Sequence, residues 1–226
     1  MSYTFHFGEV LRYWDWLLFG MANTLAFSLV AMAAGLVIGI VGAVWRNSRH
    51  VALRMLAAAY VEAIRNTPLL VQLFIVFFAL PAIGIRLSTS AAAALALTIN
   101  NGAYMTEIVR AGIDNVHRSQ REAAASLGLT RWQTFHHIVL AQAIERIYPA
   151  LVSQFILLML SSSLISAIGA EDLTAFCARI QSENFRAFEI YLVCGALYLV
   201  LTFALRGGLG VIGLLIFRRR RALARA

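Results

Sequence analysis

Polar side chains within long apolar stretches are the groups of this 226-residue sequence that could act on a solute. Asn100 and Tyr104 are four residues apart, so on a helix their amide and phenol groups would share a face. The second polar set consists of Gln154, Ser161, Ser162 and Ser163. Such groups either hydrogen-bond neighbouring helices or line a path for a polar molecule, and the sequence leaves both interpretations open.

Two pairs of opposite charge stand at the borders of apolar stretches. Glu62 and Arg65 are three residues apart, and Glu107 and Arg110 repeat that spacing. On a helix each pair would lie on one face and could form an ion pair. Such a pair either fixes a helix end near the membrane surface or acts as a gate, and both interpretations remain open.

The composition places the chain among integral membrane proteins. It is 61% hydrophobic and only 13% charged, whereas a soluble domain is about 25% charged. All basic residues are arginine, and without lysine the chain cannot carry a standard phosphate-binding loop of an ATPase. We find no nucleophile–base pair and no metal-ligand pattern, and the two cysteines form no redox motif. These observations argue against an enzyme, a cofactor of its own and a nucleic-acid partner.

Stretches without charge locate the elements that must position these groups, because a helix needs about 20 residues to cross the hydrocarbon. They predict an all-α fold and one transmembrane domain over residues 1–226. The expected spans are about 17–45, 56–80, 88–108, 134–165 and 188–212. Pro68 and Pro81 can kink or end the second span. Arg206 interrupts the fifth span, which would end near it and continue as an interfacial segment.

The arginines predict the orientation of the five spans, because arginine accumulates on the cytoplasmic side. On one side lie Arg46, Arg49, Arg54, Arg110, Arg118, Arg121, Arg131, Arg146, Arg218 to Arg221 and Arg225. On the other lie only Arg12, Arg86, Arg179 and Arg186. We expect the N-terminus outside and the C-terminus in the cytoplasm. An acidic segment, Glu171, Asp172, Glu183 and Glu189, would then face outward, either as a contact for an external partner or as a solvated loop.

Residues 119–141 form a polar island with two predicted helix starts. Ser119 and Glu122 have capping-box spacing, and Thr130 and Gln133 repeat it. Gly128, between them, can adopt a left-handed conformation and end the first helix. The pattern predicts a short surface helix at about 119–128, a corner, and a long helix that enters the membrane again.

This island resembles the EAA signature of the membrane subunits of ABC importers. The matching residues are Glu122, Ala123, Ala124, Gly128, Ile138 and Leu140, while Ala141 replaces the signature's proline. The segments 60–81, 100–112 and 161–169 resemble the polar amino-acid permease branch. Leu160 stands where that branch often has lysine, which puts charge-based recognition by this subunit in doubt.

The resemblance implies a type I ABC importer permease fold in a bacterial inner membrane. It implies transport of a polar amino acid or a close derivative, and partners that include a second permease subunit, identical or not, and an external solute-binding protein. ATP-Mg would be bound by two separate ATPase subunits. The residues expected to couple them to this chain are Glu122, Ala123, Ala124, Ser126 and Gly128.

Two other classes of function are weighed against this resemblance. A self-sufficient ion-coupled transporter or channel is the main alternative, although the chain is short and shows no inverted repeat. A membrane enzyme is the second alternative. Against it, the sequence shows neither a nucleophile–base pair nor a metal-ligand pattern. Transport that needs no ATP would favour the first alternative.

Overall fold

The structure is a computed structural model. It describes the backbone of residues 4–223, and the side chains in that range except those of residues 118, 121, 131, 141 and 218–223. The C-terminal arginines that contribute to the predicted orientation, and the Ala141 side chain, therefore lie outside the described residues. Every regular element in the described range is helical. In chain order these are α1 (Phe7–Leu11), α2 (Trp14–Arg46), α3 (Val51–Arg65), α4 (Leu69–Phe74), η1 (Ile75–Ala79), α5 (Leu80–Ala82), α6 (Thr89–Asp114), α7 (Arg118–Ser126), α8 (Arg131–Thr134), η2 (Phe135–Val139), α9 (Leu140–Ser161), η3 (Ser162–Ile168), α10 (Leu173–Asn184) and α11 (Ala187–Leu223).

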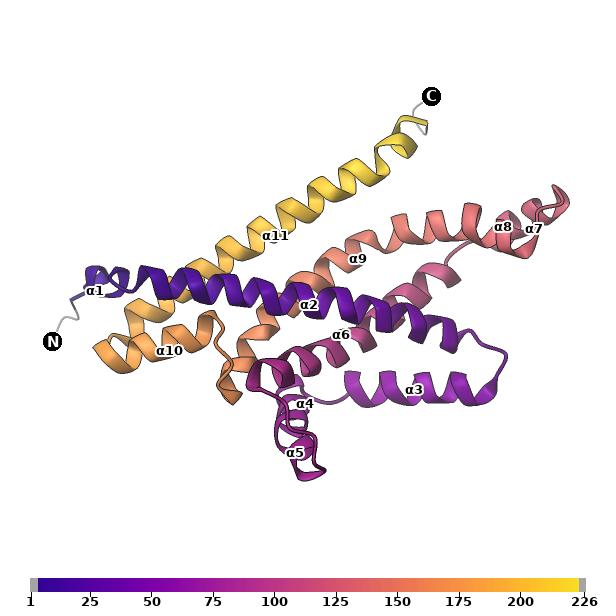
Figure 1. The fold of residues 1–226 in the computed structure, drawn as a ribbon. Coiled ribbons are helices and arrows are strands. Elements are labelled where there is room, and N and C mark those ends of the chain that lie inside the picture. The colour runs from indigo at the N-terminus through magenta and orange to yellow at the C-terminus, as the bar shows by residue number, and fades with distance from the viewer. Residues whose placement is uncertain (1–3, 224–226) are drawn as a thin grey trace.

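The long helices α2 and α6 lie side by side at the centre of the bundle, with α9 beyond them and α3 along their lower edge in Figure 1. Their close approach depends on glycines of α2. A Cβ atom on Gly39 would lie 2.3 Å from the Cβ of Met105, and one on Gly42 would lie 2.3 Å from Oγ1 of Thr106. Small residues let helix backbones pack closely within membranes. The glycines of α2 therefore allow α6 to pack closely against it.

Three helices in the described part of the chain are long and apolar enough to cross a membrane: Trp14–Arg46, Gln142–Ile168 and Ala187–Phe217. The segments Val51–Arg65 and Leu69–Ala82 meet this test together, as a pair bent by 108°. The remaining expected span, residues 88–108, coincides with α6, which does not meet it. Helix α6 contacts other helices along its length and buries Asn100 and Asn101, so it has less need of an apolar surface.

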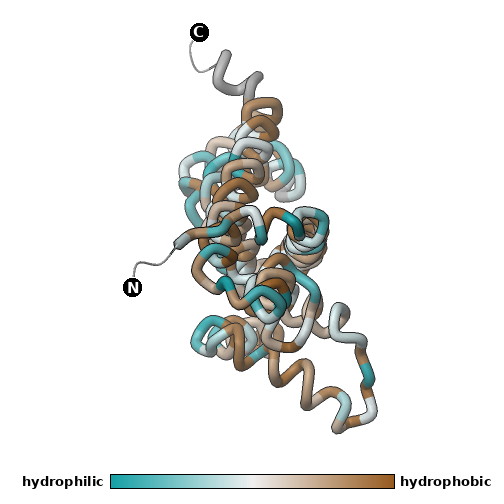
Figure 2. The backbone as a smooth tube through the Cα atoms, turned by 90° about the vertical axis from the view of Figure 1, so that its left-hand side faces the viewer, coloured by the Kyte–Doolittle hydropathy of each residue, from teal (hydrophilic) through white to brown (hydrophobic). Residues whose placement is uncertain are grey.

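The second expected span, residues 56–80, differs from a continuous helix. Helix α3 ends at Arg65, and α4 begins after Pro68 at a sharp angle. Proline has no N–H to donate and disfavours helical geometry in the residue before it, which explains the break. Residues 69–85 form a largely apolar arm whose far end projects from the bundle (Figures 1 and 2), while its first helix, α4, packs on α6 through the buried Leu73.

The end of the bundle that carries the N-terminus is closed by α10. Helix α1 is short, and α2 begins close behind it at Trp14. The amide of Asn23 donates to the carbonyl oxygen of Glu171 at 2.7 Å, and Leu173 N–H donates to Thr24 Oγ1 at 3.0 Å. These bonds fix α10 against the first long helix.

Candidate functional site

The break between α3 and α4 is held by the side chain of Gln72. Its Nε2 donates to the carbonyl oxygens of Ile64 and Thr67, at 2.7 and 3.0 Å, and to Thr67 Oγ1 at 2.9 Å. Its Oε1 accepts from Nδ2 of Asn100 at 2.9 Å. Gln72 is only 7% exposed. One amide therefore satisfies carbonyls that the broken helix leaves free, and ties the break to α6.

Asn100 was expected on a substrate path or as a bond between helices. In this conformation its side chain is buried and engaged with Gln72. Sequence analysis assigned no role to Gln72, although a glutamine four residues after a proline in an apolar stretch was a usable signal. Next to Asn100, Asn101 is fully buried, and its Nδ2 donates to the carbonyl oxygen of Ala31 at 3.2 Å.

The predicted ion pair between Glu62 and Arg65 is wrong. Glu62 instead accepts from the side chain of Asn66 at 2.8 Å. The Arg65 guanidinium lies 5.3 Å from the ring centroid of Tyr104, a cation–π contact. Arg65 is the last residue of α3 and reaches across to α6 rather than back along its own helix. Tyr104 and Asn100 thus both face the end of α3 and the break, as their shared helix face predicted.

The serine segment of the path prediction is a 3₁₀ helix whose hydroxyls bond to its own backbone. Ser162 Oγ donates to the carbonyl oxygen of Met159 at 2.7 Å, and Ser163 Oγ to that of Leu160 at 2.8 Å. The segment packs on α4 and α6 through Ile165, so it lies near the break. Ser161 and Gln154 are half-buried on α9, and neither side chain forms a hydrogen bond within the described part of the chain.

Glu107 is the centre of a charge cluster near the end of α6. Arg110 Nη2 lies 2.7 Å from Glu107 Oε2, which confirms the predicted pair. Arg46 Nε, at the end of α2, lies 3.4 Å from Glu107 Oε1, and Arg110 Nη1 lies 2.9 Å from Asp114 Oδ2. The partners Arg46 and Asp114 were missed by the sequence analysis. The cluster joins the ends of the two central helices just before the chain enters α7.

Helix α7 ends in a Schellman motif at the predicted glycine. Gly128 has φ +75°, and its N–H donates to the carbonyl oxygen of Ala125 at 3.0 Å. The N–H of Leu129 donates to the carbonyl oxygen of Ala124 at 3.1 Å. These two bonds satisfy carbonyls at the end of the helix, and the left-handed residue turns the chain.

The second predicted capping box is confirmed, whereas the first is wrong. Thr130 N–H donates to Gln133 Oε1 at 2.9 Å, and Gln133 N–H donates to Thr130 Oγ1 at 3.3 Å. At the start of α7, however, the cap is His117, whose Nδ1 accepts from the N–H of Ser119 at 3.3 Å. Ser119 lies inside the first turn, because the imidazole nitrogen already provides the acceptor that a capping serine would supply.

The predicted coupling residues differ in exposure. Ala124 is 1% exposed and faces inward, whereas Glu122, Ala123, Ser126 and Gly128 are exposed. Two large apolar side chains that sequence analysis did not single out stand beside them: Leu127 is 80% exposed and Trp132 is 73% exposed. We call residues 117–134 the knob. Its outer surface combines a narrow helix with two apolar side chains.

The knob has a firm base on α6 and α9. Val116, Val139 and Ala143 form a small buried cluster with Ile113 and Phe135 packed against it. Gln142 donates to Gln120, and Arg146 donates to the carbonyl oxygen of Asn115. These contacts tie the knob to the ends of both α6 and α9.

The acidic segment lies at the end of the bundle away from the knob, and two of its four carboxylates are buried. Asp172 is fully buried and caps α10, with Oδ1 accepting from Ala175 N–H at 2.9 Å. Its Oδ2 accepts from the Tyr198 hydroxyl at 3.1 Å. Burial raises the pKa of Asp172. Glu189 is also fully buried, and Oε1 accepts from the N–H of His6 at 3.2 Å. Only Glu171 and Glu183 remain exposed for a partner.

Comparison with known proteins gives consistent matches over most of the chain. Residues 35–215 match the family described as binding-protein-dependent transport system inner membrane component. The chain is 40% identical over 189 residues to the probable glutamine ABC transporter permease protein GlnM of Bacillus subtilis (strain 168), covering 84% of this chain and 88% of that protein. It is 36% identical over 188 residues to the glutamine transport system permease protein GlnP of Escherichia coli (strain K12), covering 82% and 86%. A solved structure described as an amino acid ABC transporter with histidines superposes with a TM-score of 0.87 at 36% identity, covering 93% of this chain and 99% of that chain.

Proposed function

We infer the function of this chain from one premise: it belongs to the family of binding-protein-dependent transport system inner membrane components. It is the transmembrane subunit of an ABC importer and a multi-pass protein of the inner membrane. We propose that it imports a polar amino acid or a close derivative, since relatives at 36% and 40% identity are named for glutamine. ATP is hydrolysed by separate subunits.

The observation that carries the coupling proposal is the knob. A narrow helix closed by a Schellman motif, with Leu127 and Trp132 exposed beside it, offers a partner both shape and apolar contact. We propose that it enters a cleft on an ATPase subunit, with Glu122, Ala123 and Ser126 at the contact. The firm base on α6 and α9 would transmit movement of that subunit to the membrane helices.

The substrate path, in our proposal, lies around the break between α3 and α4. Discontinuous helices in transporters place backbone carbonyls where they can bind a polar substrate. Here Gln72, Asn100 and the carbonyls of Ile64 and Thr67 form such a polar group. The segment from Ser161 to Ser163 lies nearby, where α9 passes into η3. We propose that the amides change partners when a substrate arrives.

We propose five membrane crossings, formed by α2, the bent pair α3 and α4–α5, α6, α9 with its flanking turns, and α11. Support for α6 is its place between α2 and α9. The N-terminus would lie outside and the knob in the cytoplasm. The arm supports pairing with a second permease subunit, because large apolar side chains cover it: Ile75 is 58% exposed, Phe78 64% and Ile83 72%.

Purification of the intact complex tests these proposals. The chain should copurify with an ATPase subunit, and mass spectrometry should find a polar amino acid in the complex. Reconstituted vesicles should take up that amino acid only when ATP and an external solute-binding protein are supplied. Uptake by this chain alone, without ATP, would instead support the ion-coupled alternative.

A further inference from the structure

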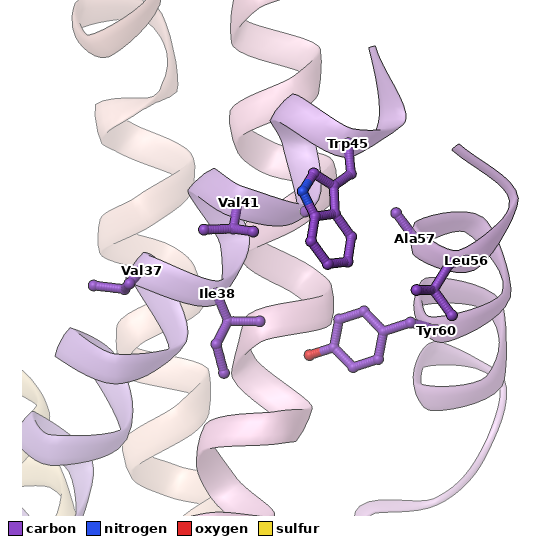
Figure 3. A pocket seen from close by; sticks show the side chains of 8 residues that line it. Val37, Ile38, Val41, Trp45, Leu56, Ala57 and Tyr60 are labelled. Carbon is purple, nitrogen blue, oxygen red and sulfur yellow. The ribbon is translucent and has the colours of Figure 1, made fainter. Parts of the chain in front are cut away.

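An apolar crevice lies between the second half of α2 and the middle of α3. Figure 3 shows its walls, with Val37, Ile38 and Val41 on one side, Leu56 and Ala57 on the other, and the rings of Trp45 and Tyr60 between them. Its volume is about 390 Å³. The mouth is open to the surroundings, since Val37 is 62% exposed, Val41 44% and Leu56 58%.

The crevice offers a ligand almost nothing polar. The hydroxyl of Tyr60 donates to the carbonyl oxygen of Ile99 at 2.6 Å, so its proton is already in use. The remaining side chains that line the crevice are aliphatic, apart from the indole of Trp45. An occupant must therefore present a hydrocarbon surface to these walls.

The end of the crevice nearest the turn 47–50 is cationic. Arg49 lies in this turn, and Arg54 lies one turn before Ala57 on the same side of α3. Both are exposed, and neither forms an ion pair or hydrogen bond within the described residues. The nearby Arg46 is already paired with Glu107. Two unneutralised guanidinium groups thus stand at one end of an apolar channel.

The start of α3 adds donors at the same end. Its cap residue His50 makes no side-chain capping bond with the described chain. The N–H groups of the first turn of α3 are therefore not capped by that side chain. The start of a helix favours negative charge and phosphate. Arginine, with its planar fork of N–H groups, is well suited to phosphate oxygens.

We propose that this crevice binds an anionic phospholipid. One acyl chain lies between α2 and α3 against Trp45 and Tyr60, and the headgroup phosphate lies on Arg49, Arg54 and the start of α3. A basic site at the membrane surface between helices is the kind of surface that recognises anionic lipid headgroups. The charge pattern favours a lipid over a transmembrane helix from a partner, which would bring no anion to the two arginines. The site is independent of the proposed transport function, because it needs only that α2 crosses a membrane.

Trp45 lies in the crevice and can report on the acyl chain directly. We would use the full chain with Trp14, Trp16 and Trp132 replaced by Phe, so that Trp45 is the one tryptophan left in it. The measurement is quenching of Trp45 fluorescence in bilayers by phosphatidylglycerol with brominated acyl chains, compared with brominated phosphatidylcholine. We expect phosphatidylglycerol to quench at lower mole fraction.

Two pairs of variants separate the headgroup from the crevice. Each basic residue near a membrane surface contributes about fivefold to binding of anionic lipid, so Arg49→Gln with Arg54→Gln should weaken the preference for phosphatidylglycerol about 25-fold. The control, Arg12→Gln with Arg86→Gln, removes the same charge elsewhere and should leave the preference unchanged. Val41→Phe should reduce quenching by filling the crevice, whereas Val44→Phe, on the same helix but outside it, should not.

Three results would overturn the proposal. Equal quenching by the two lipids in the parent chain would show that the site does not select a lipid with net negative charge. Equal loss in both arginine pairs would show a general charge effect. No quenching of Trp45 by either brominated lipid would show that protein fills the crevice.

Discussion

Replacing Gly128 by valine changes the backbone geometry of the knob without filling any space. Gly128 has φ +75°, and a Cβ atom added there would meet nothing within 4 Å. The cost is therefore conformational, roughly 1–2 kcal/mol for a residue with a Cβ in the left-handed region, and more for a β-branched one. That energy is enough to lower the population of the Schellman turn by a factor of about 5–30.

The loss should appear as weaker docking of the ATPase rather than as a loss of folding. Gly128 is not part of the two large buried clusters between the long helices. Its replacement should therefore leave membrane insertion unchanged. We expect Gly128→Asn to be mild, because asparagine tolerates this conformation, Gly128→Ala to be intermediate and Gly128→Val to be severe. The measurement is the amount of ATPase subunit that copurifies, together with amino acid uptake by vesicles.

Gly84 provides a matched control for backbone strain. It has φ +90°, and a Cβ atom there would likewise meet nothing within 4 Å, but it lies at the tip of the arm. Gly84→Val should therefore leave ATPase copurification unchanged. If Gly84→Val reduces copurification as much as Gly128→Val does, or if Gly128→Val copurifies normally, the knob is not the docking element.

Three further predictions concern other parts of the chain. Gln72→Leu removes all the bonds of that amide and leaves its partners unpaired, among them the buried amide of Asn100. An unsatisfied buried group costs about 1–3 kcal/mol, so this change should lower the thermal unfolding temperature more than Asn100→Leu, which removes one bond; equal effects would contradict this. Because the pKa of Asp172 is raised in the folded state, the folded chain holds its proton to higher pH than the unfolded chain does. Stability should therefore fall as pH rises from the usual aspartate pKa to the raised one and then level off, and Asp172→Asn should flatten that part of the pH profile in thermal unfolding. Single cysteines at Ala125 and Glu171 in a cysteine-free chain should be labelled from opposite sides of the membrane, and labelling of both from the same side would refute the orientation.

Local chemistry explains what the sequence could predict. The corner at Gly128 and the reciprocal bonds of Thr130 and Gln133 depend on residues within a few positions of one another, so their spacing alone specifies them. The long helices follow from charge-free stretches for the same reason. The wrong start of α7 is also local: His117 and Ser119 are both able to cap, and the sequence offers no measure of which acceptor is aimed at the free N–H.

Contacts between distant residues explain what the sequence could not predict. Arg65 has Glu62 three residues away, yet it lies over Tyr104 because α3 ends there against α6. Gln72 looks like any glutamine in an apolar stretch until the break brings two carbonyls and Asn100 to its amide. Asp172 and Glu189 read as a solvated acidic loop, but folding buries both. In each case the deciding partner lies on another element or beyond a break in the chain.

Helix α6 links the two parts of the proposed machinery. Asn100 ties it to the break through Gln72, Glu107 ties it to the end of α2 through Arg46, and the chain enters the knob directly after it. Polar side chains such as Asn100 and Glu107 would cost free energy if they faced lipid. Because α6 lies between α2 and α9, they face other helices instead. The close contacts of Gly39 and Gly42 with Met105 and Thr106 hold this part of α6 tightly against α2. The polar residues that make α6 a poor candidate for a span by hydropathy are therefore those that allow it to connect the knob with the break.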